Sequence, residues 1–298
     1  MRSRGPISDR GGFTLTELLV VMAIITTLAA LLFPVFRSTR AASLQNVCVQ
    51  RYKSTLTAHQ LYTGDYDDFV APATYRAGPG ANPTNDRKWP QLLAPYLRTF
   101  EEFRCPADTA QRPSTESLFD SDLIPSDASA RFYSFAERSN IGYNAYYFSP
   151  PVVFPGNRVL VSPRNLGQVE SPSNTIMFVD SIYDLDAAGR PTGGGYYVVT
   201  PPCRYIEEAD GSLSDTFQVM QVPVGGSYLH LGGWSNPKRN DRNRYGGAWP
   251  WHEGRMTVGF TDGHVAPMTP TQLVAGCENQ PEWQGTIINS GNYFWDLR

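Results

Sequence analysis

An apolar stretch near the N-terminus, residues 11–36, constrains what this chain can fold into more than any other feature. From Phe13 onward its only charged side chain is Glu17, and its other polar side chains are threonines. A helix of about 20 apolar residues spans the hydrocarbon core of a bilayer, and a threonine hydroxyl can bond a carbonyl of its own helix. The stretch therefore predicts one transmembrane helix.

The flanks of this stretch distinguish an anchor from a secretory signal. Three arginines precede it against one aspartate, which keeps this end in the cytoplasm by the positive-inside rule. A signal peptide is cut after its apolar region at a small-residue site, and no A-x-A site lies in RSTRAASLQN, the sequence directly after Phe36. A pair of small residues, Gly11 and Gly12, lies before the apolar run instead.

The sequence GFTLTE at residues 12–17 resembles the signature of type IV prepilins and of type II secretion pseudopilins. The resemblance implies cleavage after Gly12 by a prepilin peptidase and N-methylation of Phe13. Glu17 falls at the family's glutamate position, and Pro34 lies where many members have a helix-kinking proline. It also implies a single-pass protein of the bacterial inner membrane. Its C-terminal domain would be extracytoplasmic, in the periplasm or at the cell surface after assembly.

Glu17 needs a partner, because a charge at the centre of a membrane helix costs roughly 2.5–3.5 kcal/mol on insertion scales. Its place near the end of the segment reduces this cost. Cleavage would leave an amine on Phe13, and in a filament Glu17 of one subunit can pair with that amine on a neighbour. Removing one partner of a buried pair is costly, so we expect Glu17 to act in assembly. The alternative is a carboxylate that reaches the membrane surface.

Beyond the apolar stretch, the spacing predicts that the helix continues as an amphipathic stalk. Apolar residues recur at the three- and four-residue steps of one helical face: Leu44, Val47, Cys48, Tyr52 and Leu56. Core packing is the common cause of such a stripe, and a partner-binding helix is the alternative. The predicted division is a leader at 1–12, a transmembrane and stalk helix at 13–62, and a globular domain at 63–298 with an insertion at about 183–251.

The composition of the remainder favours β structure. The chain has 24 prolines and 26 glycines, and 12% of its residues are aromatic, which favours a loop-rich β domain. We therefore expect an α+β fold, with the long N-terminal helix packed on an antiparallel β domain. The net charge of −3 gives no overall attraction to nucleic acid.

Residues 255–268 predict a β-hairpin, because Asp262-Gly263 is a preferred dipeptide for a two-residue type I′ turn. This turn would place Phe260 beside Val265. A histidine, nine residues and Asp-Gly is a signature that resembles one in a large group of prepilin-like proteins, matched here by His252, Asp262 and Gly263. Further matches to that group are Cys105-Pro106, Gly142 to Asn144 and the apolar run ending in Asp180. The group has no established activity, so this resemblance implies an architecture and not a reaction.

The four cysteines are Cys48, Cys105, Cys203 and Cys277. None forms a C-x-x-C, so we do not expect zinc. Disulfides are permitted beyond the membrane, and four cysteines allow three pairings. We favour Cys48–Cys105 with Cys203–Cys277, and the alternative is free buried thiols.

An acidic cluster follows the stalk: Asp65, Asp67 and Asp68. Alternating carboxylates in a turn can ligate calcium, but the EF-hand pattern is not matched. We favour a solvated turn, with calcium as the lesser interpretation, and we expect no other cofactor.

The sequence offers little support for an enzyme. HEGRM at residues 252–256 is not the zinc-protease motif, and G-x-S-x-G and a Gly-rich phosphate loop are absent. Ten steps of extended strand, at about 3.3 Å each, would separate His252 from Asp262 by roughly 30 Å, unless a bulge at Gly254 or Gly259 intervenes. We therefore predict a structural protein without catalytic residues.

Two functions remain. The first is a filament subunit whose partners are the prepilin peptidase and other pseudopilin subunits, in a homo- or hetero-filament. The second rests on a run of basic and aromatic residues at 234–251, since such mixtures can stack on bases or sugars. It would make the protein a pilus-tip or surface binding module for glycan or DNA. The run contains Trp234, Lys238, Arg239, Arg242, Arg244, Tyr245, Trp249 and Trp251.

Overall fold

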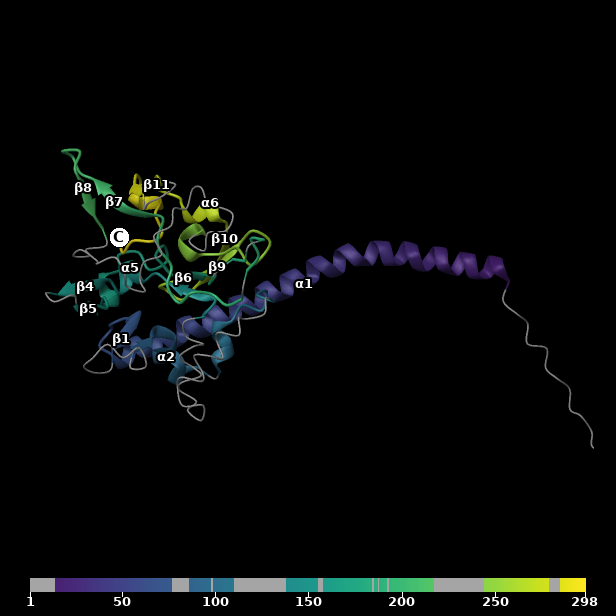
Figure 1. Cartoon of the computed structure of the whole chain (residues 1–298), viewed down its shortest axis with the longest axis horizontal. Helices are drawn as coiled ribbons and strands as arrows, with labels where there is room; N and C mark the ends of the chain where they lie inside the picture. The colour runs from purple at the N-terminus through teal and green to yellow at the C-terminus, as the bar shows by residue number, and fades with distance from the viewer. Residues whose placement is uncertain are drawn as a thin grey trace, which may run out of the picture. The chain divides into compact units, whose positions relative to one another are not determined.

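A computed structural model describes residues 14–76, 86–97, 99–109, 138–154, 158–183, 185–186, 188–191, 193–216, 244–278 and 285–298. The chain divides into two compact units, Met1–Ser43 and Leu44–Arg298. One long helix, α1 (Leu15–Asp65), starts in the first unit and ends in the second (Figure 1). The helix thus ends three residues beyond the predicted boundary at 62.

The first part of α1 is apolar on all sides and exposed. Its large apolar side chains between Leu15 and Phe36 are 46–76% exposed, and by length and composition the helix could cross a membrane. The hydroxyls of Thr26 and Thr27 donate to the carbonyls of Met22 and Ile24, each at 2.8 Å. These two threonines are therefore satisfied within the helix, as predicted from the sequence.

The second part of α1, within Leu44–Arg298, buries one stripe against the globular domain. The buried residues are Cys48, Tyr52, Thr55, Leu56, Ala58, His59, Tyr62 and Thr63. Three of the five residues predicted for this stripe are among them, whereas Leu44 is half-buried and Val47 is 41% exposed. The amphipathic stalk is confirmed, and its buried stripe begins at Cys48.

The buried stripe of α1 packs against a four-stranded antiparallel sheet. Its strand order is β10-β9-β6-β3. The strands are β3 (Ile141–Tyr143), β6 (Ile176–Asp180), β9 (Met256–Phe260) and β10 (Val265–Met268). A Cβ atom at Gly259 of β9 would lie 2.9 Å from Cδ1 of Leu56 and 3.3 Å from Cδ1 of Tyr52. Glycine at this position therefore lets the helix approach the sheet closely.

A second four-stranded sheet has the order β11-β12-β7-β8. Its strands are β7 (Cys203–Glu207), β8 (Leu213–Asp215), β11 (Cys277–Glu278) and β12 (Gly285–Ile287). Strand β12 runs parallel to β7, and the other two pairs are antiparallel. The α+β fold class is confirmed, with one parallel pair that the sequence did not indicate.

Shorter elements complete the domain. Two small hairpins pair β1 (Thr74–Arg76) with β2 (Asp86–Lys88) and β4 (Pro151–Phe154) with β5 (Arg158–Val161). The short α-helices are α2 (Trp89–Leu93), α5 (Ala145–Phe148) and α6 (Pro270–Leu273). The 3-10 turns are η2 (Ala94–Tyr96), η3 (Phe100–Phe103), η4 (Leu166–Gln168), η5 (Arg244–Gly247) and η6 (Ser290–Asn292).

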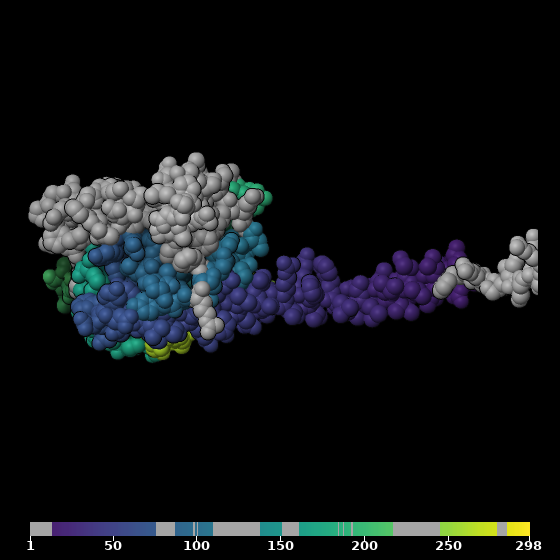
Figure 2. Space-filling model, turned by 90° about the horizontal axis from the view of Figure 1, so that it is seen from below, coloured from purple at the N-terminus to yellow at the C-terminus, as the bar shows by residue number. Residues whose placement is uncertain are grey.

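The segment 86–109 lies beside the second part of α1, and both appear in shades of blue in Figure 2. The Tyr96 hydroxyl donates to the Asp65 carboxylate at 2.6 Å, and Arg51 of α1 donates to the Arg104 carbonyl at 2.6 Å. These bonds fasten the segment to the helix at two places. Of the insertion predicted at about 183–251, β7 and β8 belong to the second sheet, and residues 217–243 lie outside the described residues.

The hairpin of β9 and β10 is present, but its predicted register is wrong by one residue. Val265 pairs with Gly259 rather than with Phe260. The Phe260 amide donates to the His264 carbonyl at 2.9 Å, so the loop has three residues. Gly263 closes it with φ +97°, a loop form in which glycine adopts the left-handed conformation. The rings of Phe260 and His264 stack at 4.1 Å between centroids.

Candidate functional site

The N-terminal signature is described only from Thr14 onward, because Gly12 and Phe13 lie outside the described residues. The carboxylate of Glu17 accepts bonds from the Thr14 amide at 2.8 Å and from the Thr14 hydroxyl at 2.7 Å. The Glu17 amide in turn donates to the Thr14 hydroxyl at 3.3 Å. This reciprocal arrangement is a capping box. In a single chain, Glu17 thus caps the N-terminus of its own helix by accepting the Thr14 amide.

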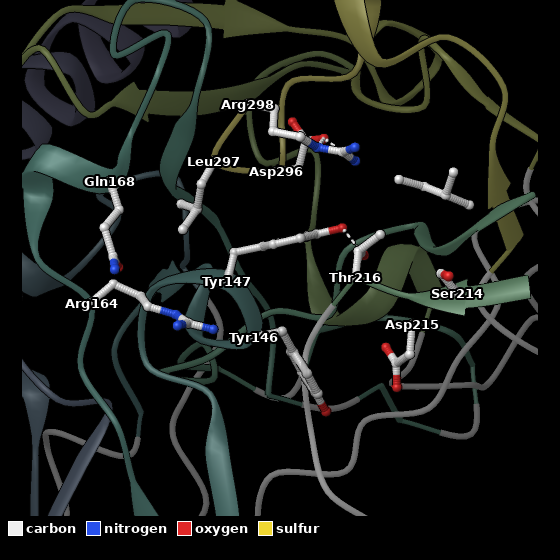
Figure 3. A pocket seen from close by; sticks show the side chains of 11 residues that line it. Tyr146, Tyr147, Arg164, Gln168, Ser214, Asp215, Thr216, Asp296, Leu297 and Arg298 are labelled. Carbon is white, nitrogen blue, oxygen red and sulfur yellow. Dashed lines mark hydrogen bonds and ion pairs between the residues drawn. The ribbon is translucent and has the colours of Figure 1, made fainter. Parts of the chain in front are cut away.

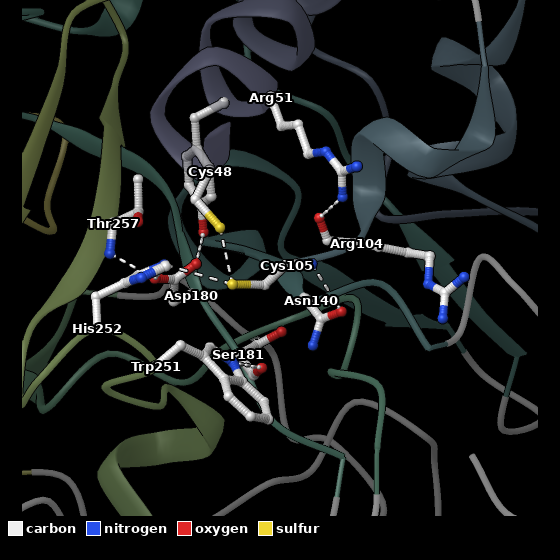
Figure 4. Close-up of polar contacts among 11 residues, drawn as sticks. Cys48, Arg51, Arg104, Cys105, Asn140, Asp180, Ser181, Trp251, His252 and Thr257 are labelled. Atoms are coloured by element: carbon white, nitrogen blue, oxygen red, sulfur yellow. Dashed lines mark hydrogen bonds and ion pairs between the residues drawn. The ribbon is translucent and has the colours of Figure 1, made fainter. Parts of the chain in front are cut away.

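A buried cluster of thiols and an imidazole lies where three distant segments meet (Figure 4). Cys48 comes from α1, Cys105 from the loop after η3, and His252 from the loop before β9. The two Sγ atoms are 2.8 Å apart, and the Cys105 Sγ is 3.4 Å from the His252 Nε2. All three donor atoms lie within 4.8 Å of one another. Among the described residues, it is the one group of three or more histidine, cysteine or carboxylate ligands that lie this close together.

Asp180, at the end of β6, borders the cluster. Its Oδ2 lies 3.8 Å from the His252 Nε2 and accepts the Thr257 amide at 2.6 Å. Its Oδ1 accepts the Tyr52 hydroxyl at 3.0 Å. Burial raises the pKa of Asp180 to about 7, although these hydrogen bonds oppose the shift. The carboxyl group is therefore fixed in position by a strand and by α1.

Burial also sets the charge of the other members. It lowers the pKa of His252 to about 4, so the imidazole is neutral at pH 7. Burial, followed by the contact with Cys48, raises the pKa of the Cys105 thiol far above its usual range. Without a cation, the thiol of Cys105 thus stays protonated.

The backbone around the cluster is rigidly held. The Cys105 amide donates to the side-chain oxygen of Asn140 at 3.0 Å. His252 and Arg255 exchange both backbone hydrogen bonds, at 3.0 and 3.1 Å. Between them Glu253 has φ 50° and Gly254 has φ 83°, the positive pair of a type I′ turn. A tight turn therefore aims His252 at the thiols.

His252 and Asp262 have different partners. Asp262 accepts from the His264 amide at 3.0 Å, and its carboxylate lies 2.7 Å from the His264 Nδ1. Asp262 and Gly263 thus form the hairpin loop, whereas His252 belongs to the thiol cluster. The tight turn at residues 252–255 interrupts the extended chain that the sequence argument assumed between them.

The two cysteine pairs differ. Cys203 and Cys277, one of the pairings favoured from the sequence, form a disulfide between β7 and β11. Cys48 and Cys105, the other favoured pairing, are adjacent but are free buried thiols. The sequence thus identified which cysteines meet, but not the imidazole beside the second pair.

The acidic residues after α1 form a turn. Asp67 and Asp68 have φ 51° and 62°, and the Asp67 carbonyl accepts from the Asn165 side chain at 3.0 Å. The Asp65 carboxylate accepts the Tyr96 hydroxyl at 2.6 Å. These contacts form the turn that the sequence predicted, and calcium binding stays a prediction from the sequence.

Only the second half of the basic and aromatic run, from residue 244 onward, lies in the described part of the chain. Trp234, Lys238, Arg239 and Arg242 lie outside the described residues. In the described part, the Trp251 indole donates to the Ser181 carbonyl at 2.9 Å beside the thiol cluster. That tryptophan is half-buried and is anchored to the domain by this bond.

A pocket of about 410 Å³ opens elsewhere, between the second sheet and the C-terminus (Figure 3). The Tyr147 hydroxyl and the Thr216 hydroxyl lie 2.7 Å apart along it. Burial raises the pKa of Asp296 to about 6, and Arg298 at 3.0 Å opposes this shift. Tyr147, Asp215, Asp296 and Arg298 are among the polar residues that line the pocket.

A family model for the prokaryotic N-terminal methylation motif matches residues 7–33. The match covers the predicted cleavage site, Glu17 and most of the apolar stretch. No curated protein matches the chain. No solved structure matches it either. The prepilin-type N-terminus is therefore shown, whereas the C-terminal His-x9-Asp-Gly signature rests on the sequence resemblance alone.

Proposed function

We propose that this protein is a structural subunit of a type II secretion pseudopilus or a type IV pilus-like filament, processed by a prepilin peptidase. One observation carries the proposal: a methylation motif at residues 7–33 leads directly into an apolar helix whose side chains are exposed. The motif supplies the processing signal, and the exposed helix supplies the surface for assembly.

The exposed apolar surface needs an environment outside the chain. Leu15, Leu31 and Phe36 are 67–76% exposed, and burying a side chain of this kind contributes about 1.5–3 kcal/mol. A bilayer provides this burial before assembly, and the helices of neighbouring subunits provide it in a filament core. The inner membrane, the peptidase and other subunits are accordingly the partners we propose.

Glu17 would then change partners on assembly. In the single chain its carboxylate binds the Thr14 amide, one residue from the amine that cleavage would leave on Phe13. In a filament the amine of a neighbouring subunit would take over this carboxylate. A buried ion pair stabilises only with good geometry, so the exchange would favour the correct axial register.

The test is Glu17→Ala in the full-length chain. Membrane insertion should be unharmed, because the change removes a carboxylate that is costly in lipid, and cleavage should continue. Recovery of sheared filaments should fall at least about tenfold, since an unpaired buried charge costs several kcal/mol. Membrane fractionation and filament recovery are measured together.

Two further variants serve as controls. Glu17→Gln keeps an acceptor without the charge and should give an intermediate yield. Gly12→Asp should block processing and leave uncleaved protein in the membrane. The proposal is wrong if Glu17→Ala subunits enter filaments as well as the wild type, or if the mature N-terminus, determined by mass spectrometry, lies beyond Phe36.

A further inference from the structure

The two cysteine pairs of the globular domain have different surroundings, and this difference points to a site. Cys203 and Cys277 have closed into a disulfide. Cys48 and Cys105 remain separate thiols, and a buried imidazole faces them. A disulfide needs only two cysteines, whereas the open pair is accompanied by a third donor atom from a third segment.

We propose that Cys48, Cys105 and His252 bind one zinc ion, and that the neighbouring Asp180 carboxylate shifts to take the fourth position. The site would be of the closed structural kind, because all four residues are buried. It is independent of filament assembly.

The donor atoms suit zinc chemically. Two thiolates and one imidazole nitrogen form a soft to borderline ligand set, which favours zinc over magnesium or calcium. Zinc requires the two thiols to lose their protons, and both protons would leave to solvent as the ion binds. The two thiolates then balance the charge of the ion. The Asp180 carboxylate adds one negative charge, which the hydrogen bonds from the Tyr52 hydroxyl and the Thr257 amide stabilise.

The distance between the two sulfur atoms needs an adjustment. With zinc–sulfur bonds of about 2.3 Å at the tetrahedral angle, two thiolates lie about 3.8 Å apart. The observed Sγ–Sγ distance of 2.8 Å must therefore widen by roughly 1 Å, within reach of side-chain rotation. The same bond lengths place sulfur and nitrogen about 3.6 Å apart, and the distance between Cys105 Sγ and His252 Nε2 is 3.4 Å.

Asp180 is the nearest further ligand to these three donors. Its Oδ2 lies 3.8 Å from the His252 Nε2, close to the roughly 3.4 Å between oxygen and nitrogen ligands on one tetrahedral zinc. Its oxygens do not lie within 4.8 Å of all three donor atoms, so the carboxylate must also move towards the sulfur atoms to reach the ion. The Tyr52 hydroxyl and the Thr257 amide hold the carboxylate. Hydrogen bonds of this kind orient the ligands of metal sites.

The experiment uses the full chain, purified in detergent without chelator or reductant. Zinc is measured by plasma mass spectrometry, and free thiols are counted after denaturation with a chelator. We expect about one zinc ion and about two thiols per chain. No zinc, with Cys48 and Cys105 joined in a peptide map, would overturn the proposal.

Matched variants identify the ligands. Cys48→Ser, Cys105→Ser and His252→Gln should each lower the zinc content at least fivefold. The double variant Cys203→Ser/Cys277→Ser removes the other cysteine pair and should keep the zinc. The proposal is contradicted if zinc persists in the three ligand variants. It is also contradicted if zinc is lost only in the Cys203→Ser/Cys277→Ser variant, because the ion would then bind elsewhere.

A measurement on the unmodified chain guards against variants that fail to fold. Zinc is removed with a chelator and replaced with cobalt(II). Tetrahedral cobalt with two thiolates gives intense visible bands and sulfur-to-cobalt charge transfer in the near ultraviolet. Weak octahedral bands without charge transfer would show that the thiols are not ligands, and would reject the site.

Discussion

The two parts of α1 are one continuous helix with opposite surface patterns. In residues 15–43 the apolar side chains surround the helix, and those up to Phe36 are 46–76% exposed. In residues 44–65 the apolar side chains form one stripe, in which Cys48, Tyr52 and Leu56 are 1–2% exposed. A helix that is apolar all round needs surroundings from outside the chain, whereas a striped helix is packed by its own domain.

This comparison separates folding from assembly along a single helix. The second part shapes the globular domain, since Gly259 and the thiol cluster both depend on its close approach. No residue of the first part belongs to the core clusters of the domain. Under the proposed function, its surface contacts lipid or other subunits. Substitutions in the two parts should therefore act on different properties.

The largest contrast should come from deleting equivalent leucine side chains in the two parts. Leu56→Ala removes a side chain packed on Gly259, and a buried leucine deletion costs about 2–5 kcal/mol. Leu28→Ala changes a side chain that is 55% exposed and should leave the domain's stability within about 0.5 kcal/mol of the wild type. Urea denaturation of the detergent-solubilised chain, followed by tryptophan fluorescence, measures both. Equal losses would show that the two parts fold as one cooperative unit.

The helix and the α+β class were predictable because their signals are local and periodic. The apolar run and the stripe at Cys48, Tyr52 and Leu56 each follow from spacing within one segment. The hairpin was also found from Asp262-Gly263, but its register was not. Asp-Gly occurs in both two-residue and three-residue hairpin loops. In the three-residue loop observed here, Phe260 stacks on His264 and Gly263 lies against Gln60, and neither contact can be read from the dipeptide.

The thiol cluster could not be predicted, because its members come from positions 48, 105 and 252 with no metal-binding spacing among them. The sequence did single out Cys105, Asp180 and His252 separately as parts of a resemblance. It predicted that Cys105 meets Cys48, but it gave no sign that His252 and Asp180 join them, since only the fold brings a helix, a loop and a tight turn together. The rejection of zinc from the absent C-x-x-C considered local spacing alone.

A smaller effect should come from the contact between α1 and the β9–β10 hairpin. Gly263→Val forces a β-branched residue to φ +97° and brings a Cβ to 3.0 Å from Nε2 of Gln60. Such backbone strain costs about 1–3 kcal/mol, so urea denaturation should show a loss near 2 kcal/mol. Gly64→Ala, near the end of α1 with open space around it, is the control and should be neutral or slightly stabilising. A stable Gly263→Val protein would mean that the loop is assigned wrongly.

The smallest effect concerns pH and again distinguishes the two parts of α1, because residues 15–43 contain no histidine. His59 is buried in the stripe, and its Nε2 accepts the Ala71 amide at 3.3 Å. Burial lowers its pKa from 6.5 to about 3. The native form thus keeps His59 neutral, while the unfolded chain gains a proton below pH 6.5. Its contribution to stability is complete above pH 6.5 and is lost as the pH falls towards 3.

At pH 5.5 this loss should be about 1 kcal/mol, since one pH unit corresponds to about 1.4 kcal/mol. His59→Gln keeps an acceptor for the Ala71 amide and cannot titrate. Between pH 7 and pH 5.5, the free energy of unfolding of the variant should therefore fall by about 1 kcal/mol less than that of the wild type. His252, whose pKa is also lowered, acts in the same direction, and Asp180 and Asp296, whose pKa values are raised, act in the opposite one. All three remain in both proteins, so the difference between the two pH profiles isolates His59. Parallel profiles would mean that His59 is not held neutral in the stripe, and that the second part of α1 is less buried than its stripe indicates.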